Sequence, residues 1–171
     1  METLHTERLT LSPCTIDDAA FLLALLNSPG WLKYIGDRNV HTLEEARSYM
    51  QNRIMKAYEK DDYGMWLVRD TTTGAAMGLC GIVVRDTLPY PDLGFAFLPE
   101  FQGKGFAFEA AQAVMEFAVG YTDIDTMLAI ATPDNTHSIK LLTKLGMSFE
   151  SEFIDPDTKD LLVRYSINLN I

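Results

Sequence analysis

The chain has 171 residues with a formal net charge of −10, and 47% of its residues are hydrophobic. This length suits a single domain over residues 1–171, and the composition is globular rather than disordered. No basic stripe and no apolar run of roughly 18 residues is present, so neither a nucleic acid nor a membrane is expected as a partner.

The first 60 residues predict a strand over residues 8–12, a helix over about 17–27 and a helical region over about 43–60. Residues 28–30, Ser-Pro-Gly, are expected to break the first helix. The second helical region opens with Thr42 and Glu45, which have the spacing of a capping box.

The rest of the chain predicts strands and helices in alternation. Three strands joined by short turns indicate an antiparallel meander over 65–69, 76–85 and 92–98. They are followed by a helix (about 105–121), a strand (127–131), a helix (about 135–145) ended by Gly146, and strands near 148–153 and 161–168. A strand, a crossover helix and another strand imply locally parallel pairing in a mixed sheet. The predicted fold class is therefore α/β, with three layers and helices on both faces.

The loop before the long helix is the segment most informative about chemistry. Gly103 and Gly105 let the backbone turn tightly and approach a ligand closely. Unpaired N–H groups at the start of the helix form an anion site that the helix dipole strengthens, and Lys104 adds a positive charge. A pyrophosphate is the ligand that such a loop suits.

Two nucleotide motifs do not match this loop. A Walker loop needs Gly-x-x-x-x-Gly-Lys followed by a hydroxyl residue, and neither that spacing nor the hydroxyl is present. The dinucleotide fingerprint needs a third glycine where this chain has Phe108. The remaining alternative is a glycine-bearing turn that binds nothing, because short glycine patterns are weak signals.

Four segments in sequence resemble the GNAT acetyltransferase superfamily. Gln102-x-x-Gly105-x-Ala107 is similar to its Gln/Arg-x-x-Gly-x-Gly/Ala motif. The others are similar to the branch of ribosomal-protein N-terminal acetyltransferases, the RimJ/RimL type. They are Thr6-Glu7-Arg8-Leu9-x-Leu11-x-Pro13, Asp92-x-Gly94-Phe95 with Glu109-Ala110 after the loop, and Asn135-x-x-Ser138-x-x-Leu141-x-x-x-Leu145-Gly146-Met147-x-x-Glu150. Together they span residues 6 to about 150.

The resemblance implies a mixed, mostly antiparallel sheet that is splayed at the cofactor site, with acetyl-CoA as co-substrate. The pyrophosphate of acetyl-CoA is expected on the loop formed by Gln102, Gly103, Lys104, Gly105, Phe106 and Ala107. The pantetheine arm is expected to pair with backbone groups of Phe97 and Leu98. Asn135 is expected to use its side-chain amide on the pantetheine, or else to cap the helix that it precedes.

At the reacting centre the resemblance implies direct attack of an amine on the thioester. Many relatives protonate the leaving thiolate with a Tyr where this chain has Leu142, and Ser138 matches the serine that takes this part in the RimL-like branch. Its alternative is a local hydrogen bond in the first helical turn. Asp92 is the candidate base through a water chain, or else it attracts the cationic acceptor. Glu150 matches the Leu-Gly-Phe-x-x-Glu pattern of the branch, or else it makes a structural bond. Asp157, in the acidic loop after Phe153, is a further candidate carboxylate.

Further expectations come from composition. Cys14 and Cys80 form no Cys-x-x-Cys pair and the three histidines lack metal-ligand spacing, so no metal is expected. The acidic charge suits a cationic amine acceptor. No secretory signal is visible, which favours the cytoplasm. The acceptor (a protein N-terminus or a small amine) and the oligomeric state (monomer or homodimer) stay open. So does a non-catalytic acyl-CoA sensor on the same fold.

Overall fold

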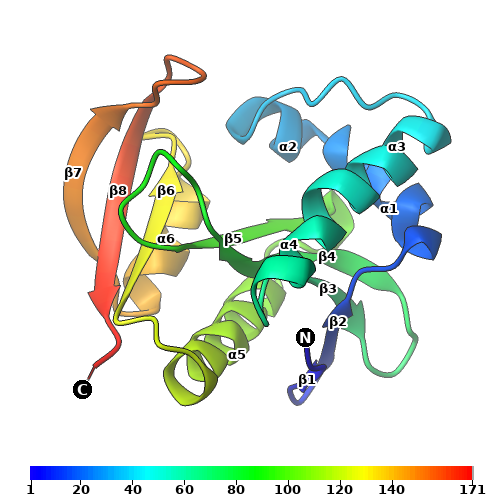
Figure 1. The fold of residues 1–171 in the computed structure, drawn as a ribbon, viewed down its shortest axis with the longest axis horizontal. Helices are drawn as coiled ribbons and strands as arrows, with labels where there is room; N and C mark the ends of the chain where they lie inside the picture. Colours follow the sequence, from blue (N-terminus) through cyan, green and yellow to red (C-terminus); the bar gives the residue numbers. More distant parts are fainter. Residues whose placement is uncertain (171) are drawn as a thin grey trace.

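The computed structural model describes residues 1–170, which form an eight-stranded sheet flanked by helices (Figure 1). The strands lie in the order β1-β2-β3-β4-β5-β6-β8-β7. Their bounds are β1 Leu4–His5, β2 Leu9–Pro13, β3 Met65–Asp70, β4 Ala76–Val83, β5 Asp92–Phe97, β6 Thr126–Ala131, β7 Ser148–Ile154 and β8 Leu161–Asn168. Every predicted strand is present, and the two-residue β1 is an additional edge strand.

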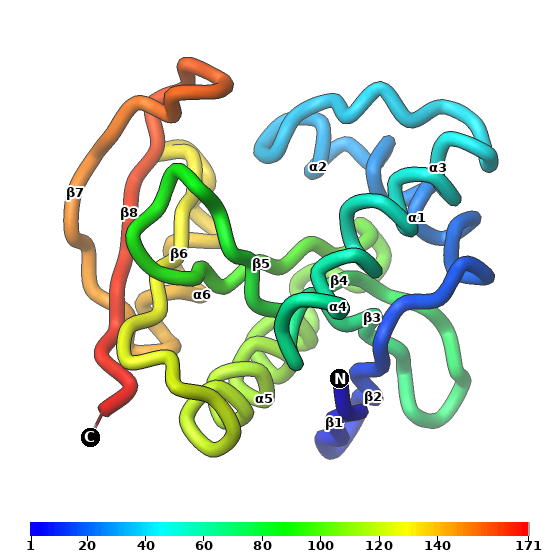
Figure 2. Tube along the Cα trace, in the orientation of Figure 1, coloured from blue at the N-terminus to red at the C-terminus, as the bar shows by residue number. Residues whose placement is uncertain are grey.

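The helices are α1 Ala19–Leu26, α2 Pro29–Tyr34, α3 Leu43–Tyr49, α4 Lys56–Lys60, α5 Phe106–Tyr121 and α6 Thr136–Lys144. A π-helical segment, Met50–Met55, joins α3 to α4, so residues 43–60 form a continuous helical rod. Figure 2 shows the chain running from the α1–α4 side of the molecule through β3, β4 and β5 to the β6–β8 side.

Helices cover both faces of the sheet, as predicted, and each face has its own hydrophobic core. On β3, Trp66 and Val68 belong to one core and Leu67 to the other, because successive strand residues point to opposite faces. The first core is closed by α5, and the second by α1, α3 and the π-helical segment. The sheet is therefore the middle of three layers.

The sheet is splayed between β5 and β6. The antiparallel meander of β3, β4 and β5 is confirmed, and β6 joins β5 in parallel after the crossover helix α5. The register of this parallel pair contains only Asp92 with Leu128, and the Leu128 N–H donates to the Pro91 carbonyl at 2.9 Å. Beyond Asp92 the two strands separate, which leaves one edge of β5 open.

Local signals in the helical region are partly confirmed. Glu45 N–H donates to Thr42 Oγ1 at 3.1 Å and Thr42 N–H donates to Glu45 Oε2 at 3.1 Å, which is the predicted capping box. The Ser-Pro-Gly break does end α1, but it also starts α2, with Ser28 as N-cap and Pro29 in the first turn. Proline fits there because its missing N–H has no intrahelical partner to lose.

Both cysteines are buried free thiols. Burial raises the pKa of Cys14 to about 11, and burial also raises the pKa of Cys80 well above its usual range. Both side chains therefore stay protonated, and neither is an activated nucleophile. Within residues 1–170, no helix combines the length and apolarity that crossing a membrane requires.

Candidate functional site

A cleft of about 1570 Å³ opens where β5 and β6 separate. One wall is formed by α2 and the rod of residues 43–60, and the other by α6 and the turn between β7 and β8. Figure 1 shows these two groups of elements on opposite sides of β5. The loop of residues 101–108 closes the cleft beside α6.

The N-terminus of α5 has no side-chain cap. Gly105 at the N-cap has φ +81° and Gly103 has φ +73°, a left-handed conformation that glycine adopts without steric cost. The Glu109 N–H donates to the Gly105 carbonyl at 3.1 Å, so the N–H groups of residues 106–108 precede the first intrahelical bond. All three of these residues line the cleft. The helix dipole makes this end an anion site.

Two side chains fix the glycine loop in position. Gln102 Nε2 donates to the Phe97 carbonyl at 2.9 Å, which ties the loop to the end of β5. Arg8 Nη1 donates to the Lys104 carbonyl at 3.0 Å, and the Arg8 guanidinium lies 4.4 Å from the Phe106 ring centroid. Lys104 itself does not line the cleft, unlike the other five residues predicted on this loop.

Arg8 is in turn held by Glu109 on α5. Arg8 Nε lies 2.7 Å from Glu109 Oε2, and Oε1 accepts hydrogen bonds from Arg8 N–H at 2.9 Å and from Thr6 Oγ1 at 2.6 Å. Burial raises the pKa of Glu109, but the hydrogen bonds from Thr6 and Arg8 outweigh it and the net pKa is lowered. In the sequence, Arg8 and Glu109 match family motifs but have no predicted role. Their opposite charges were the only local sign that they form an ion pair.

The open edge of β5 presents alternate backbone groups. Leu98 N–H donates to the Met77 carbonyl at 3.0 Å, so even-numbered residues of this strand bond to β4 and odd-numbered ones face the gap. The carbonyl of Leu98 accepts from Phe101 N–H at 3.0 Å, so both backbone groups of Leu98 are already used. The groups that face the gap are those of Phe95 and the N–H of Phe97. Strand alternation thus adds Phe95 to the candidates for pairing with the pantetheine, and the pairing of Phe97 and Leu98 stays a prediction.

Asn135 and Ser138 lie together at the start of α6. Asn135 Oδ1 accepts from Ser138 N–H at 3.3 Å, so the capping role is present, and the Nδ2 group is left for other partners. Among residues 1–170, Ser138 Oγ takes part in no intramolecular hydrogen bond, which contradicts the local-bond alternative. Both residues line the cleft.

Asp92 lies at the base of the cleft, where β5 and β6 still pair. Asp92 is 1% exposed, and Arg85 Nε donates to Asp92 Oδ1 at 2.8 Å. Burial raises the pKa of Asp92, and the Arg85 ion pair offsets this only in part. A carboxylate with a raised pKa accepts a proton more readily than an ordinary aspartate.

The turn between β7 and β8 brings carboxylates to the cleft. Asp155, Asp157 and Asp160 line it. Asp155 Oδ1 accepts from the N–H groups of Asp157 and Thr158 at 2.8 and 3.0 Å, and the bond from Thr158 is the main cause of its lowered pKa. Glu150 instead forms an ion pair of 2.6 Å with Arg164, which is a structural bond.

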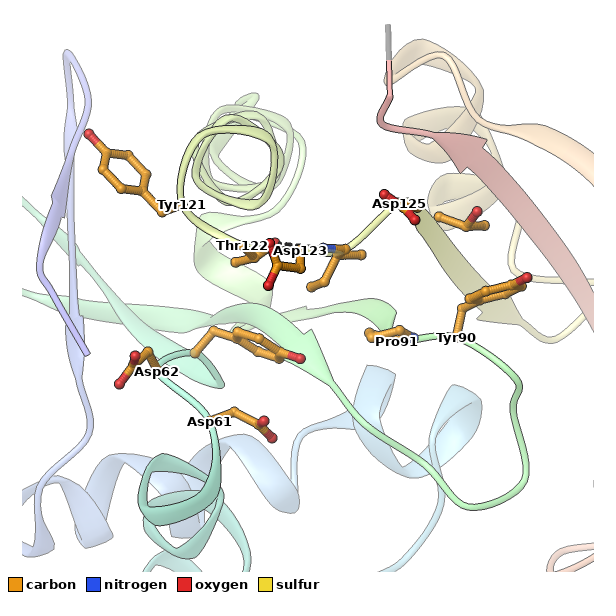
Figure 3. A pocket seen from close by; sticks show the side chains of 11 residues that line it. Asp61, Asp62, Tyr90, Pro91, Tyr121, Thr122, Asp123 and Asp125 are labelled. Atoms are coloured by element: carbon orange, nitrogen blue, oxygen red, sulfur yellow. Dashed lines mark hydrogen bonds between the residues drawn. The ribbon is translucent and has the colours of Figure 1, made fainter.

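A second, smaller hollow of about 480 Å³ lies by the C-terminal end of α5 (Figure 3). Its lining is rich in carboxylates and tyrosines: Asp61, Asp62, Tyr63, Tyr90, Tyr121, Asp123 and Asp125. In the part of the chain that the structure describes, no group of three or more His, Cys, Asp or Glu side chains is arranged to hold a metal ion.

The splayed sheet, the open edge of β5 and the uncapped helix N-terminus together define the site of an acetyltransferase with the GNAT fold. The chain belongs to the acetyltransferase (GNAT) domain family, whose model matches residues 8–148. It is therefore an acyltransferase, and enzymes of this family use acetyl-CoA as acetyl donor.

Known proteins support this assignment. An uncharacterized N-acetyltransferase, p20 of Bacillus licheniformis, is 30% identical over 155 residues, which is 89% of this chain and 84% of the relative. A GNAT-family acetyltransferase from Bacillus anthracis superposes with a TM-score of 0.82 at 22% identity, covering 99% of this chain and 100% of that one. A RimL ribosomal-protein acetyltransferase solved in complex with coenzyme A has a TM-score of 0.78 at 16% identity, with 98% of each chain covered.

Proposed function

We propose that this protein transfers the acetyl group of acetyl-CoA to a primary amine by direct attack in a ternary complex. The observation that carries this is the uncapped N-terminus of α5 beside the open edge of β5. A diphosphate matches the free N–H groups of residues 106–108, and an extended pantetheine matches the unpaired backbone groups of Phe95 and the unpaired N–H of Phe97.

In this proposal the remaining predicted residues complete the cofactor site. Gln102 fixes the Phe97 carbonyl, Gly103 and Gly105 allow close approach, and Phe106 and Ala107 line the diphosphate end. Asn135 offers its Nδ2 group to the pantetheine while its Oδ1 caps α6. Lys104 contributes its charge from outside the cleft.

The chemistry needs a base and an acid. The neutral amine attacks the thioester carbonyl, the C–S bond breaks, and the coenzyme A thiolate leaves with the electron pair of that bond and takes up the second proton that the nitrogen loses. Asp92 accepts the proton lost by the ammonium, through water, and Ser138 Oγ donates a hydrogen bond to the departing sulfur. The raised pKa of Asp92 and the unengaged hydroxyl of Ser138 support these roles.

The RimJ/RimL-like branch is the part of the family that we favour. Its support is the match of the Ser138 and Asp92 segments, together with structural neighbours that include a putative ribosomal-protein-serine acetyltransferase from Vibrio cholerae at a TM-score of 0.79. A cytoplasmic location and a single domain fit this proposal.

The test is ligand-induced stabilisation followed by turnover. Acetyl-CoA is expected to raise the thermal midpoint, whereas ATP and NAD leave it unchanged. Thiol release with a panel of amines then separates the enzyme from a non-catalytic sensor. No stabilisation at millimolar acetyl-CoA would overturn the cofactor site, and stabilisation without turnover across the panel would favour the sensor.

A further inference from the structure

The helical rod presents a row of cations to the cleft. Arg53, Lys56 and Lys60 are spaced three and four residues apart, and all three line the cleft. Glu59 and Asp61 also line it beside Lys60, so the positive charge is concentrated at Arg53 and Lys56. The opposite side of the rod is anchored in the core by Met50 and Ile54, which are 0% and 8% exposed. The row is therefore held rigidly against the second core.

These cations are free to bind a ligand. Over residues 1–170 the ion pairs of the molecule involve Arg8, Arg69, Arg85 and Arg164. No carboxylate oxygen thus lies within 4.0 Å of the charged nitrogens of the row. In a chain with a net charge of −10, an unpaired cluster of positive charge is a local exception to the overall field.

The π-helical segment determines where the row begins. An i→i+5 turn shifts the phase of the residues in it relative to an α-helix, and such turns are frequent at functional sites. Here the segment contains Asn52 and Arg53, and both line the cleft. Asn52 Nδ2 donates one hydrogen bond to Ser48 Oγ at 3.1 Å and keeps a second N–H, and the Arg53 guanidinium is a suitable donor for a carboxylate.

In the opposite wall of the cleft, the turn between β7 and β8 carries carboxylates, whereas α6 brings Lys140 and Lys144. Asp155 is occupied in capping its own turn, but neither Asp157 nor Asp160 forms an ion pair among the described residues. An ammonium is attracted to Asp157 and Asp160 in this turn, and an anion to Arg53 and Lys56 on the rod. A dication, in contrast, would have to place its second positive charge against Arg53 and Lys56.

We infer that the acceptor carries a carboxylate remote from its reacting amine, and that Arg53, Lys56 and Lys60 bind this carboxylate. The inference rests on the proposed function and narrows its acceptor class to amino acids and to peptides with an acidic residue near the N-terminus. It disfavours polyamines, which the overall acidity of the chain would otherwise suit.

The experiment compares acceptors that differ only in remote charge. The dipeptide amides Ala-Glu, Ala-Gln and Ala-Arg each have one primary amine, as do 6-aminohexanoate, 6-aminohexanamide and (6-aminohexyl)trimethylammonium. We measure kcat/KM by thiol release, and binding to the protein saturated with coenzyme A by calorimetry. The anionic member of each set is expected to exceed the cationic member by about tenfold in one or both readouts, with the advantage shrinking as salt is raised.

Variants locate the effect. The double variant R53Q/K56Q is expected to bring the anionic-to-cationic ratio to within about twofold of one. The control R47Q removes one positive charge from an exposed position on the rod that does not line the cleft, and the single variant R53Q is its matched counterpart; R47Q should leave the ratio unchanged. Equal or reversed preference in the native protein, no binding or turnover of any of these compounds while acetyl-CoA still binds, or an equal effect of R47Q would each overturn the inference. Failure of acetyl-CoA to bind would instead overturn the proposed function.

Discussion

Arg8 and Glu109 are 101 residues apart in the chain, yet Arg8 Nε lies 2.7 Å from Glu109 Oε2. Through this pair the start of β2 is joined to α5, and the guanidinium reaches the Lys104 carbonyl on the glycine loop. The shape of the anion site therefore depends on an interaction that lies outside the cleft.

Replacing Glu109 with Gln is expected to weaken both folding and cofactor binding. The amide cannot accept three hydrogen bonds with a full negative charge, so the free energy of unfolding should fall by about 1–3 kcal/mol. Acetyl-CoA affinity should fall with it because the loop is less constrained. Denaturant unfolding and calorimetry measure the two effects. The control is Glu116→Gln, an exposed glutamate on the same helix with no ion pair among residues 1–170.

The same glutamate predicts a pH dependence of stability. Its pKa is lower in the folded protein than its ordinary value of 4.5, so the folded state binds protons less readily than the unfolded one. The contribution of Glu109 is fully present above that value and is lost as the pH falls through the lowered pKa. The difference in unfolding free energy between the native protein and E109Q should shrink in acid. A difference that stayed constant into that range would contradict the assigned ion pair.

Gly105→Val is expected to remove acetyl-CoA binding. A β-branched residue at φ +81° costs about 1–2 kcal/mol of stability. Its Cβ would lie 3.4 Å from Arg8 Nη2, so the side chain would displace the guanidinium that fixes the Lys104 carbonyl and would distort the loop. Gly74→Val is the matched control, since Gly74 has φ +75° and lies in the turn between β3 and β4. Thermal shift with acetyl-CoA should be lost only in G105V, and equal shifts in both variants would argue against the loop as the diphosphate site.

Ser138→Ala is expected to reduce kcat by about 10²-fold while acetyl-CoA affinity stays within about twofold. The Asn135 cap survives this change, because Oδ1 binds the backbone N–H of residue 138 rather than the hydroxyl. Steady-state thiol release and calorimetry separate the two quantities. An unchanged kcat would assign protonation of the thiolate to another group or to water.

Asp92→Asn is expected to remove the acidic limb of the pH profile. The base works in its ionised form, so activity of the native protein should fall as the pH drops through the raised pKa of Asp92. In D92N, kcat should be lower by about 10²-fold and should no longer follow that limb, whereas the rise due to deprotonation of the amine remains. Because Arg85 loses its partner, thermal stability is measured in parallel. A profile with the limb intact would make Asp92 a structural residue.

Much of the fold was predictable from local patterns. The strand over 65–69, the capping box at Thr42 and the glycine after α6 are each specified by residues close in sequence, and the structure contains all three. The π-helical geometry of residues 50–55 was not predictable, because the spacing of their hydrophobic residues is compatible with an ordinary α-helix. Likewise, Pro29 could signal either a break or a first helical turn, and here it is both.

The glycine loop of the site was predictable, because its motif encodes the backbone conformation. The residues that depend on strand pairing or on contacts between distant segments were less predictable. Gly103 and Gly105 mark the loop directly, since only left-handed residues fit there. The choice between Phe95 and Leu98 depends on which residues of β5 form hydrogen bonds with β4, as Leu98 does with Met77. A single sequence does not contain that information. The contact of Arg8 with Glu109 was hidden for the same reason.

The splay of the sheet has a consequence for backbone dynamics. The amides of Phe95 and Phe97 face the gap without a strand beside them, so in the free protein they should exchange with solvent deuterium much faster than those of Gly94 and Ala96, which bond to β4. An extended molecule in the gap would act as a missing strand and slow only the odd-numbered positions. Residue-resolved exchange would therefore show protection at every second residue of β5 when the gap is occupied, without any measurement of turnover.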